Sequence, residues 1–187
     1  QKVAVGALQG RKGAVVVLDP ASGGILSLVS TPSFDPNLFV TGIDHKSYAE
    51  LRNSRAIPLF NRALRGQYPP GSTIKPFIAL AGLDNETITP ETEVGDPGFF
   101  QLKGNSHKYR DWKRQGHGWM DLKSAVAESC DVYFYDLGHR LGVDQMHSYM
   151  ARFGFGKLIA HDIRQAKSGL LPSREWKRAH HSLPWFP

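Results

Sequence analysis

Hydrophobic and polar positions in the first third of the chain follow a pattern that is typical of β-strands. Two mostly apolar runs, at residues 14–18 and 25–30, flank turn-forming residues at 19–24, which predicts a β-hairpin. Both runs are too apolar for a strand with one face in water, so we expect the hairpin to lie in a covered sheet. Residues 1–66 are therefore expected to form strands of a sheet and their connections.

Beyond residue 70 the apolar positions follow a helical period. Ile74, Phe77, Ile78 and Ala81 have the i, i+3, i+4, i+7 spacing of a helix that faces a core. Further helices are predicted at 121–128, with Asp121 as N-cap, at 132–141 and 144–153, and short ones at 46–51 and 174–178.

The segments between these helices divide the rest of the chain. Residues 99–118, rich in aromatic, basic and glycine residues, are predicted to form a long structured loop, and loops of this length are usually functional or held by something. We therefore expect a helical subdomain at 67–157 and a mostly irregular tail at 158–187.

Composition narrows the class of protein. The chain has 187 residues, 41% of them hydrophobic and 21% charged, as in soluble globular proteins. No apolar run reaches membrane-spanning length, and the N-terminus is not signal-like. The chain opens on Gln1 rather than Met, so we expect it to be a portion of something longer. Cys130 is the single cysteine, which excludes an internal disulfide framework.

A net charge of +6 and a pI near 9.5 are compatible with nucleic-acid binding. The basic residues are scattered apart from clusters at 109–114 and 174–178, and neither cluster fits a nucleic-acid-binding module. An anionic polymer or a membrane surface nearby explains the charge equally well. We therefore expect no nucleic-acid partner.

Ser72 and Lys75 form the first candidate catalytic pair. Tyr68-Pro69-Pro70-Gly71 delivers the chain to a helix start, and the three-residue spacing puts both side chains on one face. A lysine can remove the proton of a serine hydroxyl, and helix N-terminal amides favour a developing oxyanion. The alternative is a capped surface helix with an ordinary lysine, because Ser-x-x-Lys alone is a weak signal.

Ser129-Cys130-Asp131 places a second hydroxyl and a carboxylate at the junction of two predicted helices. Such a serine can relay a proton between Lys75 and a leaving amine, and the aspartate can hold the lysine or a substrate amide. The bare pattern is again weak, since Ser33-Phe34-Asp35 matches it within a predicted extended turn.

Together these motifs resemble those of the penicillin-binding proteins. The segment 67–76 resembles their Ser-x-x-Lys box, and 129–131 resembles their Ser-x-Asn box in an Asp form. Segments 8–12, 109–113 and 172–177 are similar to those of the elongation-type class B enzymes, and the matches cover nearly the whole chain. The resemblance implies an α+β fold of the penicillin-binding-protein and β-lactamase type, a sheet flanked by helices plus a helical subdomain, of which only the N-terminal portion is present.

The resemblance also implies a function and a cellular place. These enzymes are peptidoglycan D,D-transpeptidases that cross-link stem peptides and are acylated by β-lactams. Ser72 would attack the D-Ala-D-Ala carbonyl, Lys75 would take its proton, Ser129 would pass a proton to the departing D-alanine, and Asp131 would orient the peptide. The partners would be a SEDS-family glycan polymerase and elongation-complex proteins, at the periplasmic face of the bacterial inner membrane, with the membrane anchor outside this portion and no organic cofactor.

Two departures from the family stand out. The third box, Lys-Thr/Ser-Gly, is absent from these 187 residues, so this portion alone is expected to be inactive. Residues 158–162 stand where the family tends to have a Thr-Gly turn. Two alternatives share the motifs: a serine β-lactamase, although no Glu-x-x-Leu-Asn segment follows Asp131, and a non-catalytic penicillin sensor or scaffold.

A candidate zinc site follows from the oxidising compartment that the resemblance implies. A lone thiol there is vulnerable to oxidation unless it is buried or bound to a metal. Asp96, Asp111 and His117 lie in or beside the long loop and, with Cys130, offer two carboxylates, an imidazole and a thiolate, which favours a structural zinc ion. The alternative makes Cys130 a small buried residue, Asp96 a turn former and Asp111 a partner of Arg110 or Lys113.

Overall fold

The computed structural model describes residues 1–159 and 162–180, and it divides into two compact units. The first unit comprises Gln1–Gln67 with Ala160–Lys167, and the second comprises Tyr68–Ile159 with Ser168–Pro187. Each is described by itself. No helix among the described residues combines the length and apolar character that crossing a bilayer requires.

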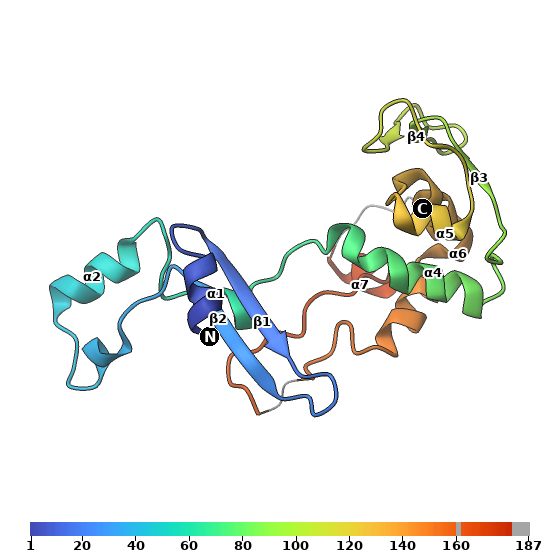
Figure 1. Ribbon diagram of the computed structural model, residues 1–187. Coiled ribbons are helices and arrows are strands. Elements are labelled where there is room, and N and C mark those ends of the chain that lie inside the picture. The colour runs from blue at the N-terminus through green and yellow to red at the C-terminus, as the bar shows by residue number, and fades with distance from the viewer. Residues whose placement is uncertain (160–161, 181–187) are drawn as a thin grey trace. The chain divides into compact units, whose positions relative to one another are not determined.

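The first unit is built on an antiparallel hairpin of two strands, as predicted (Figure 1). Val15 pairs with Val29, and the register shifts between Val17 and Leu18, a bulge near the turn. The elements of this unit are α1 (Lys2–Ala7), β1 (Gly13–Leu18), β2 (Ile25–Thr31), η1 (Pro36–Phe39), α2 (His45–Asn53) and α3 (Arg62–Arg65).

Within the described residues this hairpin is only partly covered, and the prediction that it lies in a covered sheet stays a prediction for the longer protein. Val29 is buried, but apolar residues near the turn are 41–66% exposed: Val16, Val17, Leu18, Ile25 and Leu26. The helices that contact the hairpin, α1 and α3, have only six and four residues, too few to cover its length.

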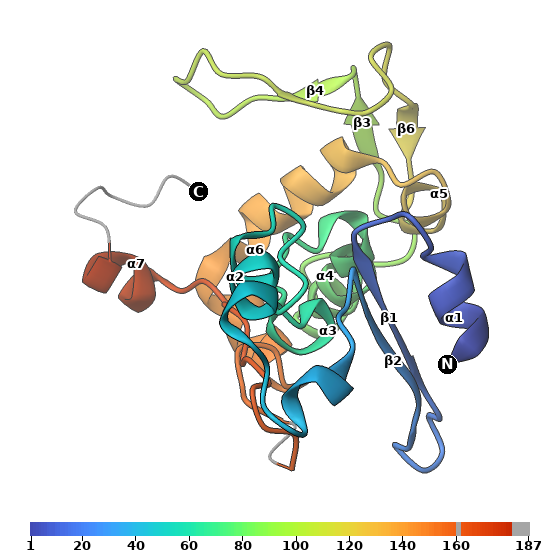
Figure 2. The same ribbon diagram turned by 90° about the vertical axis from the view of Figure 1, so that its left-hand side faces the viewer.

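The second unit is a helical core with a looped arm. Its elements are η2 (Gly71–Ile74), α4 (Lys75–Asp84), β3 (Val94–Asp96), β4 (Phe99–Phe100), β5 (Tyr109–Arg110), β6 (Gly118–Met120), α5 (Leu122–Ala127), α6 (Asp131–Ala151) and α7 (Arg174–His180). Figure 2 shows β3 and β6 side by side, with β4 in the arm beyond them.

Helices α4, α5 and α6 share one hydrophobic core. Ala81, Ala125, Tyr133 and Leu137 are at most 1% exposed. A Cβ on Gly82 would lie 2.9 Å from the Leu137 side chain, so this glycine permits the close approach of α4 to α6. The predicted core-facing helix and the Asp121 N-cap, which accepts the Ser124 N–H at 2.8 Å, are confirmed.

The structure refines the prediction for two segments. The helices expected at 132–141 and 144–153 run as α6, but Gly142 inside it has non-helical angles, φ 71° and ψ 159°, so the predicted break is real. The loop expected at 99–118 contains short paired strands, β4 with β5 and the start of β6 with β3. They were missed because two- and three-residue strands carry no detectable period.

Candidate active site and metal centre

Lys75 lies at the centre of the candidate active site. It begins α4, is 8% exposed, and its Nζ donates to the Asp131 carboxylate at 2.6 Å. The same Nζ lies 2.7 Å from the Ser129 carbonyl and 3.1 Å from the Ser129 Oγ. The structure thus brings together three of the four predicted catalytic side chains. Asp131 here holds the lysine, which was one of the two roles considered for it.

Ser129 occupies a strained backbone position between α5 and α6. Its φ of 55° lies in the left-handed region, which costs an L-residue about 1–2 kcal/mol. Backbone hydrogen bonds hold this turn: the Ser129 N–H donates to Val126 and the Cys130 N–H to Ala125. The geometry turns the Ser129 carbonyl and hydroxyl toward Lys75, and strain of this kind is typical of functional sites.

Ser72 lies in the 3₁₀ turn η2, one turn before Lys75. Pro76 cannot donate to the Ser72 carbonyl, and the Lys75 N–H donates to it instead, which tightens the turn as the proline predicts. Ser72 lies three residues before Lys75, and side chains three apart in a 3₁₀ turn share a face. Ser72 is exposed, and its hydroxyl has no hydrogen-bond partner over residues 1–159 and 162–180.

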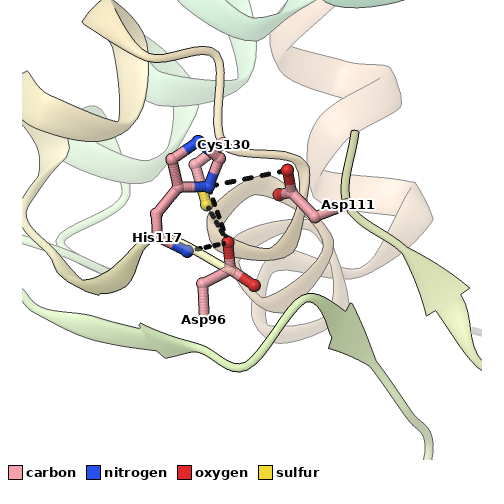
Figure 3. Close-up of side chains that lie close together, drawn as sticks. All are labelled: Asp96, Asp111, His117 and Cys130. Atoms are coloured by element: carbon pink, nitrogen blue, oxygen red, sulfur yellow. Dashed lines mark hydrogen bonds and ion pairs between the residues drawn. The ribbon is translucent and has the colours of Figure 1, made fainter. Parts of the chain in front are cut away.

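The four predicted metal ligands converge in one buried cluster (Figure 3). The ligand atoms of Asp96, Asp111, His117 and Cys130 all lie within 4.8 Å of one another. His117 Nδ1 is 2.7 Å from Asp96 Oδ2 and 3.5 Å from Asp111 Oδ1, and the Cys130 Sγ is 3.5 Å from Asp96 Oδ2. Parts of the alternative also hold: Cys130 is buried, and Asp96 accepts the Gly98 N–H at 2.6 Å in a turn. Asp111 accepts the Lys113 backbone N–H at 3.0 Å, but no ion pair of Asp111 with an Arg110 or Lys113 side chain occurs among the described residues.

Two glycines allow the loop to fold around this cluster. A Cβ on Gly98 would lie 2.3 Å from the Arg114 carbonyl oxygen, and one on Gly116 would lie 2.1 Å from that of Asp96. Both glycines have positive φ, 93° and 78°. No other residue fits either position without moving backbone atoms.

The electrostatics of the cluster fit a bound cation. Burial raises the pKa of the Asp96 carboxyl, but hydrogen bonds from His117, Gly98 and Cys130 outweigh burial and hold that pKa below its usual value. Burial raises the pKa of the Cys130 thiol to about 12, and the charges of Asp96 and Asp111 act in the same direction. Without a cation the thiol stays protonated, whereas a divalent metal favours the thiolate.

Asp111 connects the cluster to the Ser129-Cys130-Asp131 motif. Its Oδ2 accepts the N–H groups of Asp131 at 2.7 Å and Val132 at 3.1 Å, the first free amides of α6. This capping role was missed because the acceptor lies 20 residues from the helix start. Trp112, which contacts the same segment, was also unassigned, and only its place in the 109–113 match pointed to it.

The chain matches the family model described as "Penicillin binding protein transpeptidase domain" over residues 13–183. Peptidoglycan D,D-transpeptidase MrdA from Acinetobacter baumannii is 50% identical over 186 residues, which cover 100% of this chain and 28% of that protein. The chain therefore spans about a quarter of the length of this curated relative.

Two solved structures are similar over 99% of the chain. PBP2 from Pseudomonas aeruginosa, in complex with WCK 5153, is 55% identical with a TM-score of 0.94, over 42% of that chain. PBP2 from Helicobacter pylori, in complex with MreC, is 34% identical with a TM-score of 0.93, over 34% of that chain. These matches confirm the predicted α+β transpeptidase fold. The chain belongs to the penicillin-binding protein transpeptidase domain family.

Proposed function

We propose that this chain carries the nucleophile-bearing part of a peptidoglycan D,D-transpeptidase. The observation that carries the proposal is the buried Lys75 Nζ, held by the Ser129 carbonyl, the Ser129 Oγ and the Asp131 carboxylate. A buried lysine three residues after an exposed serine, with a second hydroxyl within hydrogen-bond distance of its Nζ, is the set of groups that Ser-Lys acyl transfer uses. The curated relatives, which carry this activity in their names, support it.

Each residue then has a defined task. The Ser72 Oγ attacks the carbonyl of the terminal D-Ala-D-Ala bond, and Lys75 accepts the hydroxyl proton. The Ser129 hydroxyl, within hydrogen-bond distance of Lys75, passes a proton to the departing amine of D-alanine. An amine from a second stem peptide then attacks the acyl-enzyme carbonyl, the new amide bond replaces the bond to the Ser72 Oγ, and the amine proton passes through Lys75 to that oxygen. Asp131 holds the lysine for these transfers.

A fluorescent β-lactam tests this function in the full-length protein. We expect a stable acyl adduct on Ser72, together with turnover of a stem-peptide substrate. Ser72→Ala should abolish labelling, whereas the control Ser33→Ala, in the other unit, should keep it. Labelling that persists at another serine would contradict the assignment, and rapid hydrolysis of the β-lactam would indicate a β-lactamase.

We propose further that the cluster of Asp96, Asp111, His117 and Cys130 holds a structural zinc ion. Nitrogen, sulfur and carboxylate donors in a tetrahedral set are typical zinc ligands. Bound metal would fix the loop whose Asp111 caps α6. Elemental analysis should find about one zinc per chain, and a strong chelator should lower the melting temperature. Protein without stoichiometric metal, or with a melting temperature unmoved by chelator, would contradict it.

The cellular setting is the third part of the proposal. We expect the full-length protein at the periplasmic face of the inner membrane, anchored outside residues 1–187, with a SEDS-family polymerase and elongation-complex proteins as partners. Its support is the family itself and the MreC complex of the Helicobacter pylori relative. Cross-linking in cells, followed by identification of a polymerase in the product, tests the partnership.

A further inference from the structure

Trp112 makes specific contacts although most of its side chain is in water. The residue is 61% exposed, so burial alone contributes little to fixing it. Its backbone N–H donates to Asp131 Oδ2 at 3.3 Å, and its indole Nε1–H donates to the Glu128 carbonyl at 3.1 Å. The ring also meets His117 edge to face, with centroids 5.4 Å apart.

The two hydrogen bonds enclose the strained turn. Glu128 is the C-cap of α5, and its carbonyl is one of those that a helix end leaves without a backbone donor. Ser129, with its positive φ, follows immediately. Asp131, the second acceptor, begins α6. One residue of the loop therefore holds the chain on both sides of Ser129.

We propose that Trp112 is a positioning residue for acylation, an inference that rests on the proposed transpeptidase function. Its indole N–H fixes the peptide unit before Ser129, and its backbone N–H fixes the carboxylate that holds Lys75. Loss of the indole hydrogen bond lets the turn relax, and the Ser129 oxygens then move away from Lys75. Small displacements of this kind lower the rate of a chemical step more than they lower binding.

The test replaces the Trp112 indole by its benzothiophene isostere in the full-length protein, which exchanges only the N–H for sulfur. Acylation by a fluorescent penicillin is followed in stopped flow and separated into the binding constant and the first-order acylation rate. We expect the acylation rate to fall roughly 5- to 30-fold, with the binding constant within about twofold of the parent. Trp112→Phe should likewise lower the acylation rate and leave the binding constant nearly unchanged.

Trp119 provides the matched control. It is 75% exposed in the neighbouring strand β6, and its indole N–H has no hydrogen-bond partner in the described part of the chain. The same isostere there should leave both constants unchanged. An unchanged acylation rate in the Trp112 isostere would overturn the proposal. So would a change in the binding constant alone, which would make the ring a substrate contact.

Amide hydrogen exchange decides the question even if the parent is not acylated, the outcome in which the proposed function itself fails. The backbone N–H groups of Ser129 and Cys130 donate hydrogen bonds to the carbonyls of Val126 and Ala125, respectively. In the Trp112 isostere they should exchange at least about fivefold faster than in the parent, with α4 amides unchanged. Exchange equal to the parent at both positions would overturn the positioning role.

Discussion

The pattern Ser-x-Asp occurs twice in the chain, and its two copies have very different structural surroundings. Ser33 and Asp35 are exposed, and the Asp35 carboxylate accepts the Asn37 N–H at 2.9 Å as an ordinary cap of η1. Ser129 has a left-handed backbone, and Asp131 is paired with the buried Lys75. The same residue types therefore form a turn in one region and a candidate catalytic centre in the other. The surroundings, rather than the three residues, supply the chemistry.

The largest expected difference between the two regions comes from their aspartates. Asp131→Asn removes the negative partner of Lys75, and we expect acylation to fall ~10²-fold or more in the full-length protein. The unfolding free energy should fall by about 2 kcal/mol, less than for a fully buried pair because Asp131 is 24% exposed. Asp35→Asn should change neither, since asparagine caps equally well. Equal effects of the two substitutions would contradict the proposed difference between the two aspartates.

A substitution in the loop that carries Asp111 and His117 should weaken the region of Ser129 and Asp131. Gly116→Ala forces a Cβ against the Asp96 carbonyl, so we expect a stability loss of more than about 3 kcal/mol, less bound metal and slower acylation. Gly104→Ala is the control, because Gly104 also has a positive φ of 79° but nothing within 4 Å of its Cβ position. It should cost only about 1 kcal/mol. Thermal melts and metal analysis of both variants measure the difference.

The smallest expected effect concerns the backbone of the two serines. Ser129→Gly and Ser129→Ala both remove the hydroxyl, but glycine also relieves the positive φ. The glycine variant should therefore be more stable by roughly 0.5–1 kcal/mol, with equally slow acylation. At Ser33, where φ is not positive, the order should reverse. Denaturant titrations of the four variants check this, and the same order at both positions would refute the role of strain.

The periodic elements and the local motifs were predictable from the sequence. The apolar spacing from Ile74 located α4, and turn residues at 19–24 located the hairpin. The two serine motifs contain Lys75, Ser129 and Asp131, which the structure brings together. The four polar residues in or beside the long loop form a second, adjoining cluster.

Two contacts between distant residues were not predicted. The capping of α6 by Asp111 and the hydrogen bond from Trp112 to Glu128 each join residues 16 or more positions apart. No periodicity encodes them, because they depend on how the loop closes over Gly98 and Gly116. The elements that would cover the exposed end of the hairpin could not be named for a related reason, since an apolar run does not say what will cover it.

The break at Gly142 has a consequence for how disturbances spread along α6. The residue divides a 21-residue helix into a first half that begins with Asp131 and a second half that carries Met146 and Met150. A rigid rod would transmit a tilt at one end to the other, but a joint with non-helical angles interrupts the ladder of backbone hydrogen bonds. The second half still reaches α4 through side-chain packing, since Met146 lies against the shared core and Phe77, two residues after Lys75, contacts Phe153 just beyond α6. A change in the far half of α6 is therefore expected to act on Lys75 through its packing against α4 and not along the axis of α6.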